Sequence, residues 1–521
     1  MRSVGTVLVL AVLATAVATG ARRWRIPAPS LLVIVGLGVA LAPGVPEIRV
    51  SPEVIGLVVL PPLLYASAEE LSWRELRMVW KPVGVLAVGL VLASAAAVGV
   101  VVSALTPLSW QMAFVLGSVL ASTDPVAVTA LGRRLALPPR VQVLVQAESL
   151  FNDATSLVLF RVAVSVAVAS SAVSWGSAGG EFALLAGGGT VIGAGVALVV
   201  GVIRRRTEDP VLETVIALVT PYAAYVLAES AHTSGVTSVV VAGVILGGRG
   251  DRLTDARIRL QLHAVYGTVV FLLESVVFSL IGLALPTLIR ELPEGYGLWP
   301  LHALAVAATL VAVRMVWLFP LSALMQRKGG APATSSWRVP AVLTWAGTRG
   351  VVPLAAALSI PVVAEDGTVL DQRPLVVVLA TSVVVLTLIA QGFTLAPLVR
   401  RSGIALEPAH TEQEEAEARC SLAGAGLRRV EELSELEAVP DVVLDRLRRG
   451  LQARLEHAED MLGEADPAES ANEVYRQLRR ELIRVEAAEL QRLYEDHDIS
   501  DTTRRRLQRS LDLEDARLAD G

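Results

Sequence analysis

The chain has 521 residues, of which 53% are hydrophobic and 18% are charged, and its mean hydropathy is +0.58. Soluble domains carry about 25% charged residues, so this composition excludes a disordered, fibrous or disulfide-stapled chain, and the single cysteine, Cys420, excludes an internal disulfide. The net charge of −5 divides into +7 over residues 1–401 and −12 over residues 402–521. This asymmetry predicts a domain boundary near Arg401.

Long apolar runs follow one another from the N-terminus to about residue 400. Most reach the roughly 20 residues that cross hydrocarbon, and a backbone in lipid must satisfy its own hydrogen bonds, which predicts helices. The thirteen runs are residues 4–20, 27–44, 50–68, 82–105, 110–131, 141–169, 182–203, 210–229, 233–248, 265–290, 299–325, 338–361 and 374–399. The first run also resembles a signal peptide, since Ala16-Val17-Ala18 is typical of a cleavage site, but the arginines after it favour retention.

Positive residues between the runs favour one orientation. With the N-terminus outside, 21 positive residues fall in inside loops and four fall outside, as the positive-inside rule requires. The acidic tail, residues 402–521, is then cytoplasmic. The sequence has only two lysines, Lys81 and Lys328, but many alanines and glycines. This composition indicates a GC-rich bacterial genome and hence a bacterial plasma membrane.

Several charged residues fall inside the apolar runs, where a charge costs at least ~2.5–3.5 kcal/mol and indicates function. They are Asp124, Glu148, Asp153, Arg161, Glu274, Arg314 and Arg349. Glu213 and Glu229 lie near helix ends, where snorkelling to the membrane surface explains them. Arg161 has the same explanation, or it pairs with an acid.

The sixth run places four polar groups on one helical face. Glu148, Ser149, Asn152 and Asp153 fall within an arc of about 140° at 3.6 residues per turn. Serine and asparagine alone would fit a helix-packing strip. Two carboxylates in the same strip favour a site of oxygen ligands instead.

Two other runs carry helix-breaking residues. The fifth reads Thr123-Asp124-Pro125, and the twelfth reads Gly347-Thr348-Arg349-Gly350 with Pro353 after it. Each alone would fit a simple kink. The fifth and twelfth runs are separated by an odd number of membrane crossings, seven, so they cross the membrane in opposite directions. Such pairs of broken helices mark the binding site of secondary transporters with inverted repeats. The repeats are then helices one to six and eight to thirteen, with Asp124 balancing exposed helix N-termini and Arg349 balancing C-termini.

These three motifs, with Phe151-Asn152-Asp153 as the second, resemble those of sodium/proton antiporters of the NhaP/NHE type, the monovalent cation:proton antiporter-1 family. The resemblance covers residues 1–400. It implies an all-α membrane protein with thirteen transmembrane helices and crossed discontinuous helices, followed by a small soluble helical domain. It also implies a homodimer in the lipid bilayer, with a core of helices at about 82–169 and 299–399 that moves against a dimer scaffold at about 4–68 and 182–290.

The resemblance also implies roles for individual residues. Asp153 is the ion- and proton-binding carboxylate, and Asp124, Ser149 and Thr123 join it in binding Na⁺. Asn152 stands where electrogenic relatives have a second aspartate. The structural charges of the core are Glu148, Arg314, Arg349 and Glu274, where Glu274 matches a family acidic position with a structural or regulatory role. Either arginine is a candidate partner for Glu148. Tyr65 is followed by Ala66, where some relatives carry a carboxylate, so a ligand from the third helix is doubtful.

The chemistry follows from one acidic site. Sodium prefers oxygen ligands, and removal from water penalises a charged carboxylate, so Asp153 can hold a proton or a cation in turn. Competition at this site predicts antiport of Na⁺, and of Li⁺, for H⁺ in pH homeostasis, with no cofactor, ATP or enzymatic step. With Asn152 neutral the expected exchange is electroneutral, one for one, although Asp124 and Asp153 titrate as a coupled pair.

Other functions remain open on the sequence. K⁺/H⁺ exchange fits the same scaffold, and a cation channel fits the same polar strip. An intramembrane protease also uses paired aspartates, but here Gly-x-Gly-Asp occurs only at residues 248–251, where the chain leaves an apolar run for a loop, and Arg349 would have no role. The tail predicts helices near 411–437, 440–464, 469–497 and 500–518, either as a plain bundle or as a regulatory module, and no nucleic acid is expected as a partner.

Overall fold

The computed structural model is all-helical over the residues that it describes, as the sequence predicts. Its only extended pairing there is an isolated bridge between Val363 and Val369. The described residues are 12–21, 23, 27–42, 55–71, 73–124, 139–168, 175–207, 209–248, 256–329, 337–363, 369–403, 408–435, 440–460, 462, 468–496 and 501–519. They form two compact units, Met1–Ala405 and Leu406–Gly521.

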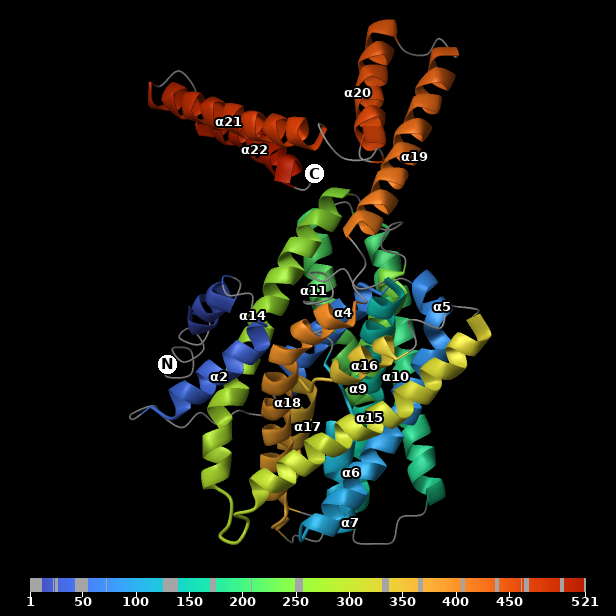
Figure 1. Cartoon of the computed structure of the whole chain (residues 1–521), viewed down its shortest axis with the longest axis vertical. Helices are drawn as coiled ribbons and strands as arrows, with labels where there is room; N and C mark the ends of the chain where they lie inside the picture. The colour runs from blue at the N-terminus through green and yellow to red at the C-terminus, as the bar shows by residue number, and fades with distance from the viewer. Residues whose placement is uncertain are drawn as a thin grey trace. The chain divides into compact units, whose positions relative to one another are not determined.

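The first unit contains the apolar helices (Figure 1). After the helix Val12–Ala21 they are α2 (Ala28–Ala40), η1 (Ile55–Val59), α4 (Leu60–Glu69), α5 (Trp73–Gly84), η2 (Val85–Leu90), α6 (Val91–Leu105), α7 (Trp110–Leu120), α9 (Pro139–Val168), α10 (Trp175–Arg204), α11 (Pro210–Ser230), α12 (Gly235–Gly247), α14 (Ala256–Arg290), α15 (Trp299–Gly329), α16 (Arg338–Trp345), α17 (Val351–Leu358) and α18 (Arg373–Ser402). Here η1 and η2 are π-helical turns.

Seven described helices are long and apolar enough to cross a membrane. They are Leu76–Leu105, Gln142–Val168, Gly176–Arg204, Pro210–Ser230, Ile258–Arg290, Trp299–Ala323 and Arg373–Ser402. Each of the other six predicted runs contains shorter helix in the described residues. The protein is therefore a multi-pass membrane protein by the length and composition of its helices.

Local sequence signals explain where the helices begin and end. Ser109 accepts a hydrogen bond from the Met112 backbone at the start of α7 (3.3 Å), and Asp209 does the same for Val211 at the start of α11 (2.7 Å). At the other end of the unit, α18 stops at Gly403, whose φ of 63° suits glycine.

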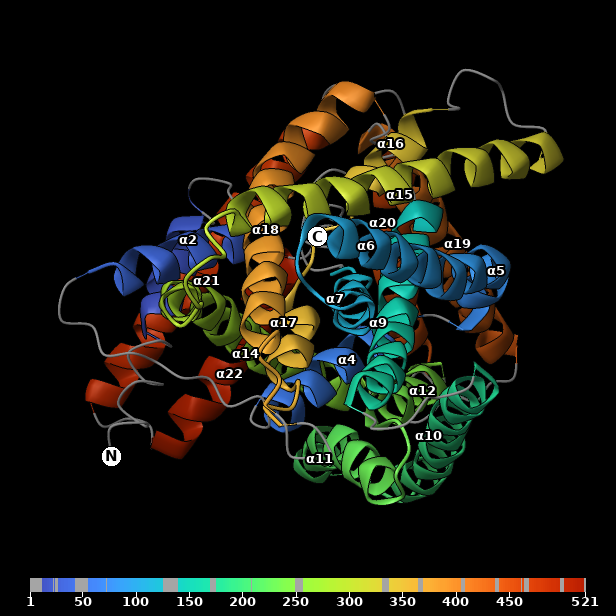
Figure 2. The same cartoon turned by 90° about the horizontal axis from the view of Figure 1, so that it is seen from below.

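Small residues let neighbouring helices of the first unit approach closely. A β-carbon at Gly36 of α2 would collide with the backbone of Ser279 in α14, and one at Gly282 of α14 would collide with Val33 of α2. Membrane helices associate through such small-residue contacts. Elsewhere α10, α11 and α12 pack together on one side, while α15 crosses α6 and α18 on another (Figure 2).

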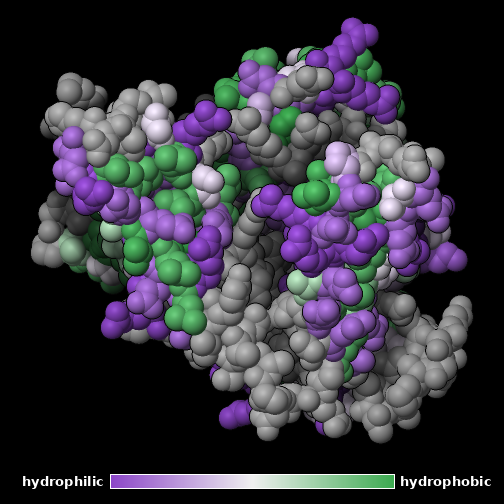
Figure 3. Space-filling model, turned by 90° about the horizontal axis from the view of Figure 1, so that it is seen from above, coloured by the Kyte–Doolittle hydropathy of each residue, from purple (hydrophilic) through white to green (hydrophobic). Residues whose placement is uncertain are grey.

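The second unit consists of two helical hairpins. The helices α19 (Pro408–Glu435) and α20 (Asp441–Asp460) pack together, as do α21 (Ala468–Glu495) and α22 (Asp501–Ala519). Charged side chains with strips of exposed leucine and valine cover these helices (Figure 3). Arg479 of α21 pairs with Glu514 of α22 at 2.6 Å.

Candidate functional site

Two interrupted helices meet inside the first unit. Helix α7 ends at Leu120 and residues 122–124 are non-helical, while residues 347–350 separate α16 from α17. The backbone N–H of Asp124 donates to the Thr348 carbonyl (2.8 Å), and the Thr348 hydroxyl donates to the Asp124 carbonyl (3.1 Å). The interruptions predicted in the fifth and twelfth runs therefore lie against each other. Pro125 falls outside the described residues.

The polar strip of α9 binds the interrupted stretch after α7. The Asn152 amide accepts from the Thr123 backbone N–H (3.3 Å) and donates to the Thr123 hydroxyl (2.7 Å). The Ser149 hydroxyl donates to the Thr123 carbonyl. These contacts satisfy backbone groups that the helix break leaves without helical partners, and they fix residues 122–124 beside Asp153, the next residue of the strip.

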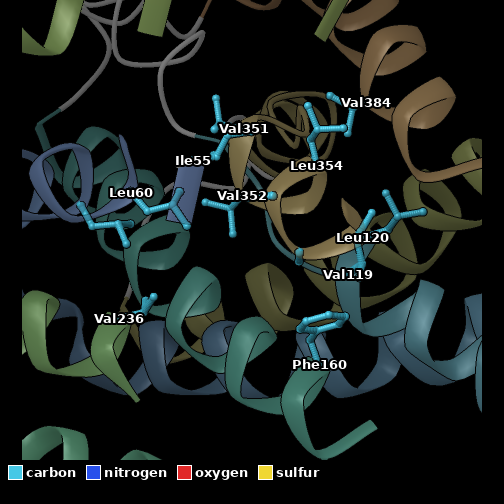
Figure 4. Close-up of a cluster of buried hydrophobic side chains, with 14 of the residues drawn as sticks. Ile55, Leu60, Val119, Leu120, Phe160, Val236, Val351, Val352, Leu354 and Val384 are labelled. Atoms are coloured by element: carbon cyan, nitrogen blue, oxygen red, sulfur yellow. The ribbon is translucent and has the colours of Figure 1, made fainter. Parts of the chain in front are cut away.

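Asp153 and Asp124 line one cavity at this crossing. Asp153 is only 7% exposed, and the cavity has room of about 60 Å³ for water-sized molecules, enough for a few waters, since one water needs about 10–15 Å³ on this measure. Its polar lining comes from Ser67, Ser122, Thr123, Asp124, Asp153 and Glu274. Aliphatic side chains complete the wall, among them Leu60, Val351 and Val352 (Figure 4).

Charged groups stand at the interrupted helix ends. A β-carbon at Gly350, the residue before α17, would collide with the Asp124 carboxylate, so this acid lies at a helix N-terminus, where negative charge is favourable. The Arg349 guanidinium donates to the carbonyls of Leu120, the last residue of α7 (3.2 Å), and of Gly347, just beyond α16. A cation there is favourable because helix C-termini carry partial negative charge.

Glu148 pairs with Arg314 and not with Arg349, the other candidate partner that the sequence allows. Two hydrogen bonds join them, Nη1 to Oε1 at 2.6 Å and Nη2 to Oε2 at 2.8 Å. The Arg314 Nε also donates to the Leu343 carbonyl at the end of α16 (2.9 Å). Both side chains are almost fully buried, so a neutral ion pair ties α9, α15 and α16 together.

Sequence reasoning did not identify every polar residue of the cavity. Ser122 precedes the Thr123-Asp124 motif and is not among the predicted ligands, and Ser67 lies on α4, the helix from which the sequence makes a ligand doubtful. The Ser122 hydroxyl is fully buried and has no hydrogen-bond partner within the described residues. Adjacency to the motif was the only available signal for Ser122, whereas Ser67 becomes visible only when α4 packs against α9.

Two acids assigned to snorkelling are held by arginines. Glu213 is completely buried and accepts from Arg204 at 2.7 Å, so the snorkelling interpretation is wrong for this residue. Glu229 pairs with Arg161 at 2.5 Å. Both partners of that second pair are partly exposed, and the pair joins α9 to the end of α11.

Comparison with known proteins gives consistent results. A family model described as the transmembrane sodium/hydrogen exchanger matches residues 8–401. An uncharacterised Na⁺/H⁺ exchanger of Mycobacterium tuberculosis is 33% identical over 534 residues, covering 99% of this chain and 96% of that protein. The Na⁺/H⁺ antiporter ApNhaP of Aphanothece halophytica is 34% identical over 381 residues, covering 73% of this chain and 70% of that protein.

A solved structure shares the fold. The sodium proton antiporter MjNhaP1 from Methanocaldococcus jannaschii at pH 8 superposes with a TM-score of 0.61 and 19% sequence identity. The match covers 77% of this chain and 99% of that structure. At this identity the likeness is one of fold alone.

Proposed function

The chain belongs to the sodium/hydrogen exchanger family of secondary transporters, and from this premise we propose that Asp153 binds Na⁺ and H⁺ in turn. The observation that carries the proposal is the buried Asp153 beside Asp124 in a cavity at the crossing of two interrupted helices. Asp124, Ser149 and Thr123 supply the further oxygen ligands that sodium prefers. Asn152 positions Thr123 and adds no charge.

The exchange is electroneutral, one Na⁺ or Li⁺ for one H⁺. Asn152 is neutral, and the charges of Glu148 and Arg314 cancel within their own pair. One exchangeable proton at Asp153 then leaves the net charge of the loaded site unchanged between the two halves of the cycle. The two carboxylates Asp124 and Asp153 share that titration as a coupled pair.

The transport cycle uses alternating access. Thirteen transmembrane helices form two inverted repeats, and the core helices at about 82–169 and 299–399 rock against the scaffold helices at about 4–68 and 182–290. The scaffold forms the contact of a homodimer. The protein lies in a bacterial plasma membrane with its N-terminus outside and residues 402–521 in the cytoplasm, where the tail either packs as a plain bundle or makes regulatory contacts.

Proton flux in proteoliposomes tests the assignment of Asp153. An outward Na⁺ gradient should acidify the lumen of wild-type vesicles, as a trapped pH dye reports. Asp153→Asn should abolish this flux, because an amide neither binds a proton nor neutralises a cation. Asp371→Asn makes the same change in a loop outside the cavity and should retain it. Retained flux in Asp153→Asn would remove the assignment.

Null-point measurements test the stoichiometry, and ion substitution tests the cation. For one-for-one exchange, net flux stops when the Na⁺ and H⁺ concentration ratios across the membrane are equal, at every membrane potential. A null point that moves with potential contradicts this ratio. Supplying Na⁺, Li⁺ and K⁺ one at a time separates Na⁺/H⁺ exchange from K⁺/H⁺ exchange, and cation flux without an opposing proton flux would instead indicate a channel.

A further inference from the structure

Glu274 lies in the cavity wall, whereas the family resemblance implies a structural or regulatory role for it. It belongs to the middle of α14, and its neighbours in the wall include Phe278 of the same helix. Within the described residues it forms no hydrogen bond and no ion pair. A structural charge in a membrane helix is expected to have such a partner, so the position of Glu274 calls for another explanation.

Glu274 does not complete the ion site as a third acidic ligand. No three Asp, Glu, His or Cys side chains among the described residues lie close enough together to hold one metal ion. Asp124 and Asp153 come from the α7 break and from α9, whereas Glu274 comes from α14, which packs against α4 and α17. Glu274 therefore reaches the cavity from a different helix than the two aspartates.

The ionisable side chains of the cavity wall are all acidic. Three carboxylates line it and no lysine, arginine or histidine does. The Ser122 hydroxyl in the same wall is fully buried and adds an oxygen beside the carboxylates. A cleft lined by groups of one sign with low-dielectric walls concentrates ions of the opposite sign, so the lining of this cavity favours cations over anions.

We propose that Glu274 is the cation-recruiting residue of the cavity, which sets the apparent affinity for Na⁺ without taking part in the exchange at Asp153. The proposal rests on the proposed function. Glu274 stays on the scaffold side while the core carries the ion across. It raises the cation concentration at one face of the site, and the exchange of that cation for a proton takes place at Asp153.

The test separates recruitment from structure through KM and Vmax. Glu274→Gln keeps the shape and removes the charge, so the KM for Na⁺ should rise about three- to tenfold while Vmax stays within about twofold. Glu274→Asp keeps the charge and should remain near the wild-type KM. Glu294→Gln makes the same change in the exposed loop after α14 and should have no effect.

Salt provides a second readout that a structural role would not affect. Raising ionic strength with an inert organic cation screens the cavity, so the KM difference between wild type and Glu274→Gln should shrink. An unchanged KM, or a lost Vmax with unchanged KM, overturns the proposal. If wild-type vesicles show no Na⁺-driven proton flux, the proposed function fails. Glu274 is then tested by the Na⁺ concentration that half-saturates the rise in Tm, and equal values in wild type and Glu274→Gln overturn recruitment.

Discussion

Asn152 bonds Thr123 through both ends of its amide, and this holds a neutral residue firmly beside Asp153. The sequence places Asn152 and Asp153 in one polar strip, because residues three or four apart on a helix share a face, but it does not predict the bond from Asn152 to Thr123, 29 residues away. It does not identify long-range pairs. Glu148 and Arg314 are 166 residues apart, and only the packing of α9 against its neighbours selects Arg314 rather than Arg349.

Breaking the Glu148–Arg314 pair on one side should destabilise the protein strongly. Glu148→Gln leaves a buried guanidinium without its counter-charge, with an expected loss of about 3–5 kcal/mol. The double variant Glu148→Gln with Arg314→Met removes both charges and should recover most of that loss. Thermal unfolding in detergent compares wild type with the two variants. A single variant as stable as wild type would contradict the structural role of this pair.

The interrupted helices α7 and α16–α17 position the site, and the sequence predicts both breaks from their glycines and Thr-Asp-Pro signal. It does not predict how the stretches touch, because the hydrogen bonds between Asp124 and Thr348 join segments 224 residues apart. Nor does it predict that Glu274 of α14 faces the same cavity. The helix signals are local, whereas the cavity results from several helices that meet only in the folded chain.

Filling the space at Gly350 should displace Asp124. The backbone φ of Gly350 is −118°, outside the left-handed region that favours glycine, and the added methyl group of Gly350→Ala would collide with the Asp124 carboxylate. We expect exchange to fall more than about tenfold, as a misplacement of about 1 Å can cost far more in a site of fixed geometry. Gly267→Ala adds a methyl group where nothing lies within 4 Å and serves as the control. Equal Na⁺-driven proton flux in both variants would contradict the prediction.

Tying α9 to α11 should stop the proposed rocking motion. In a Cys420→Ser background, Arg161→Cys with Glu229→Cys places thiols where the ion pair joins these helices, and a short reducible cross-linker can connect them. Cross-linking should lower exchange more than about tenfold, as domain motions limit such transport cycles, and a reductant should restore it.

The matched control for that experiment lies within the scaffold. The Tyr222 hydroxyl of α11 donates to the Val58 carbonyl at 3.1 Å, so Val58→Cys with Tyr222→Cys joins two segments proposed to move together. Exchange should survive this cross-link. Full activity in the cross-linked Arg161→Cys, Glu229→Cys protein would show that α9 and α11 need not separate.

At the scale of the whole molecule, the chain divides into an apolar, mildly basic part and a polar, acidic part, and the composition alone indicates this. The structure describes two compact units, Met1–Ala405 and Leu406–Gly521. Seven described helices reach membrane-spanning length, so the count of thirteen spans stays a prediction. The loop charges that set the orientation act during insertion into the membrane.

Labelling Cys420 tests the predicted orientation without any mutation. This cysteine lies on α19 of the second unit and is partly exposed. A membrane-impermeant maleimide should label it in inside-out vesicles and leave it unlabelled in intact cells. Cys420→Ser controls for non-specific labelling. Labelling from the outer surface of intact cells would reverse the orientation.

The backbone contact between α2 and α14 has a consequence for the far side of the cavity. Gly36 and Gly282 let the backbones of the two helices come into direct contact. This close packing fixes the position of α14 against α2. A methyl group added at either glycine would push α14 away from α2 and shift Glu274, which lies on α14, with it. Substitutions at Gly36, on a helix that does not line the cavity, should therefore be felt as altered sodium affinity, a remote effect that no inspection of the ion ligands would suggest.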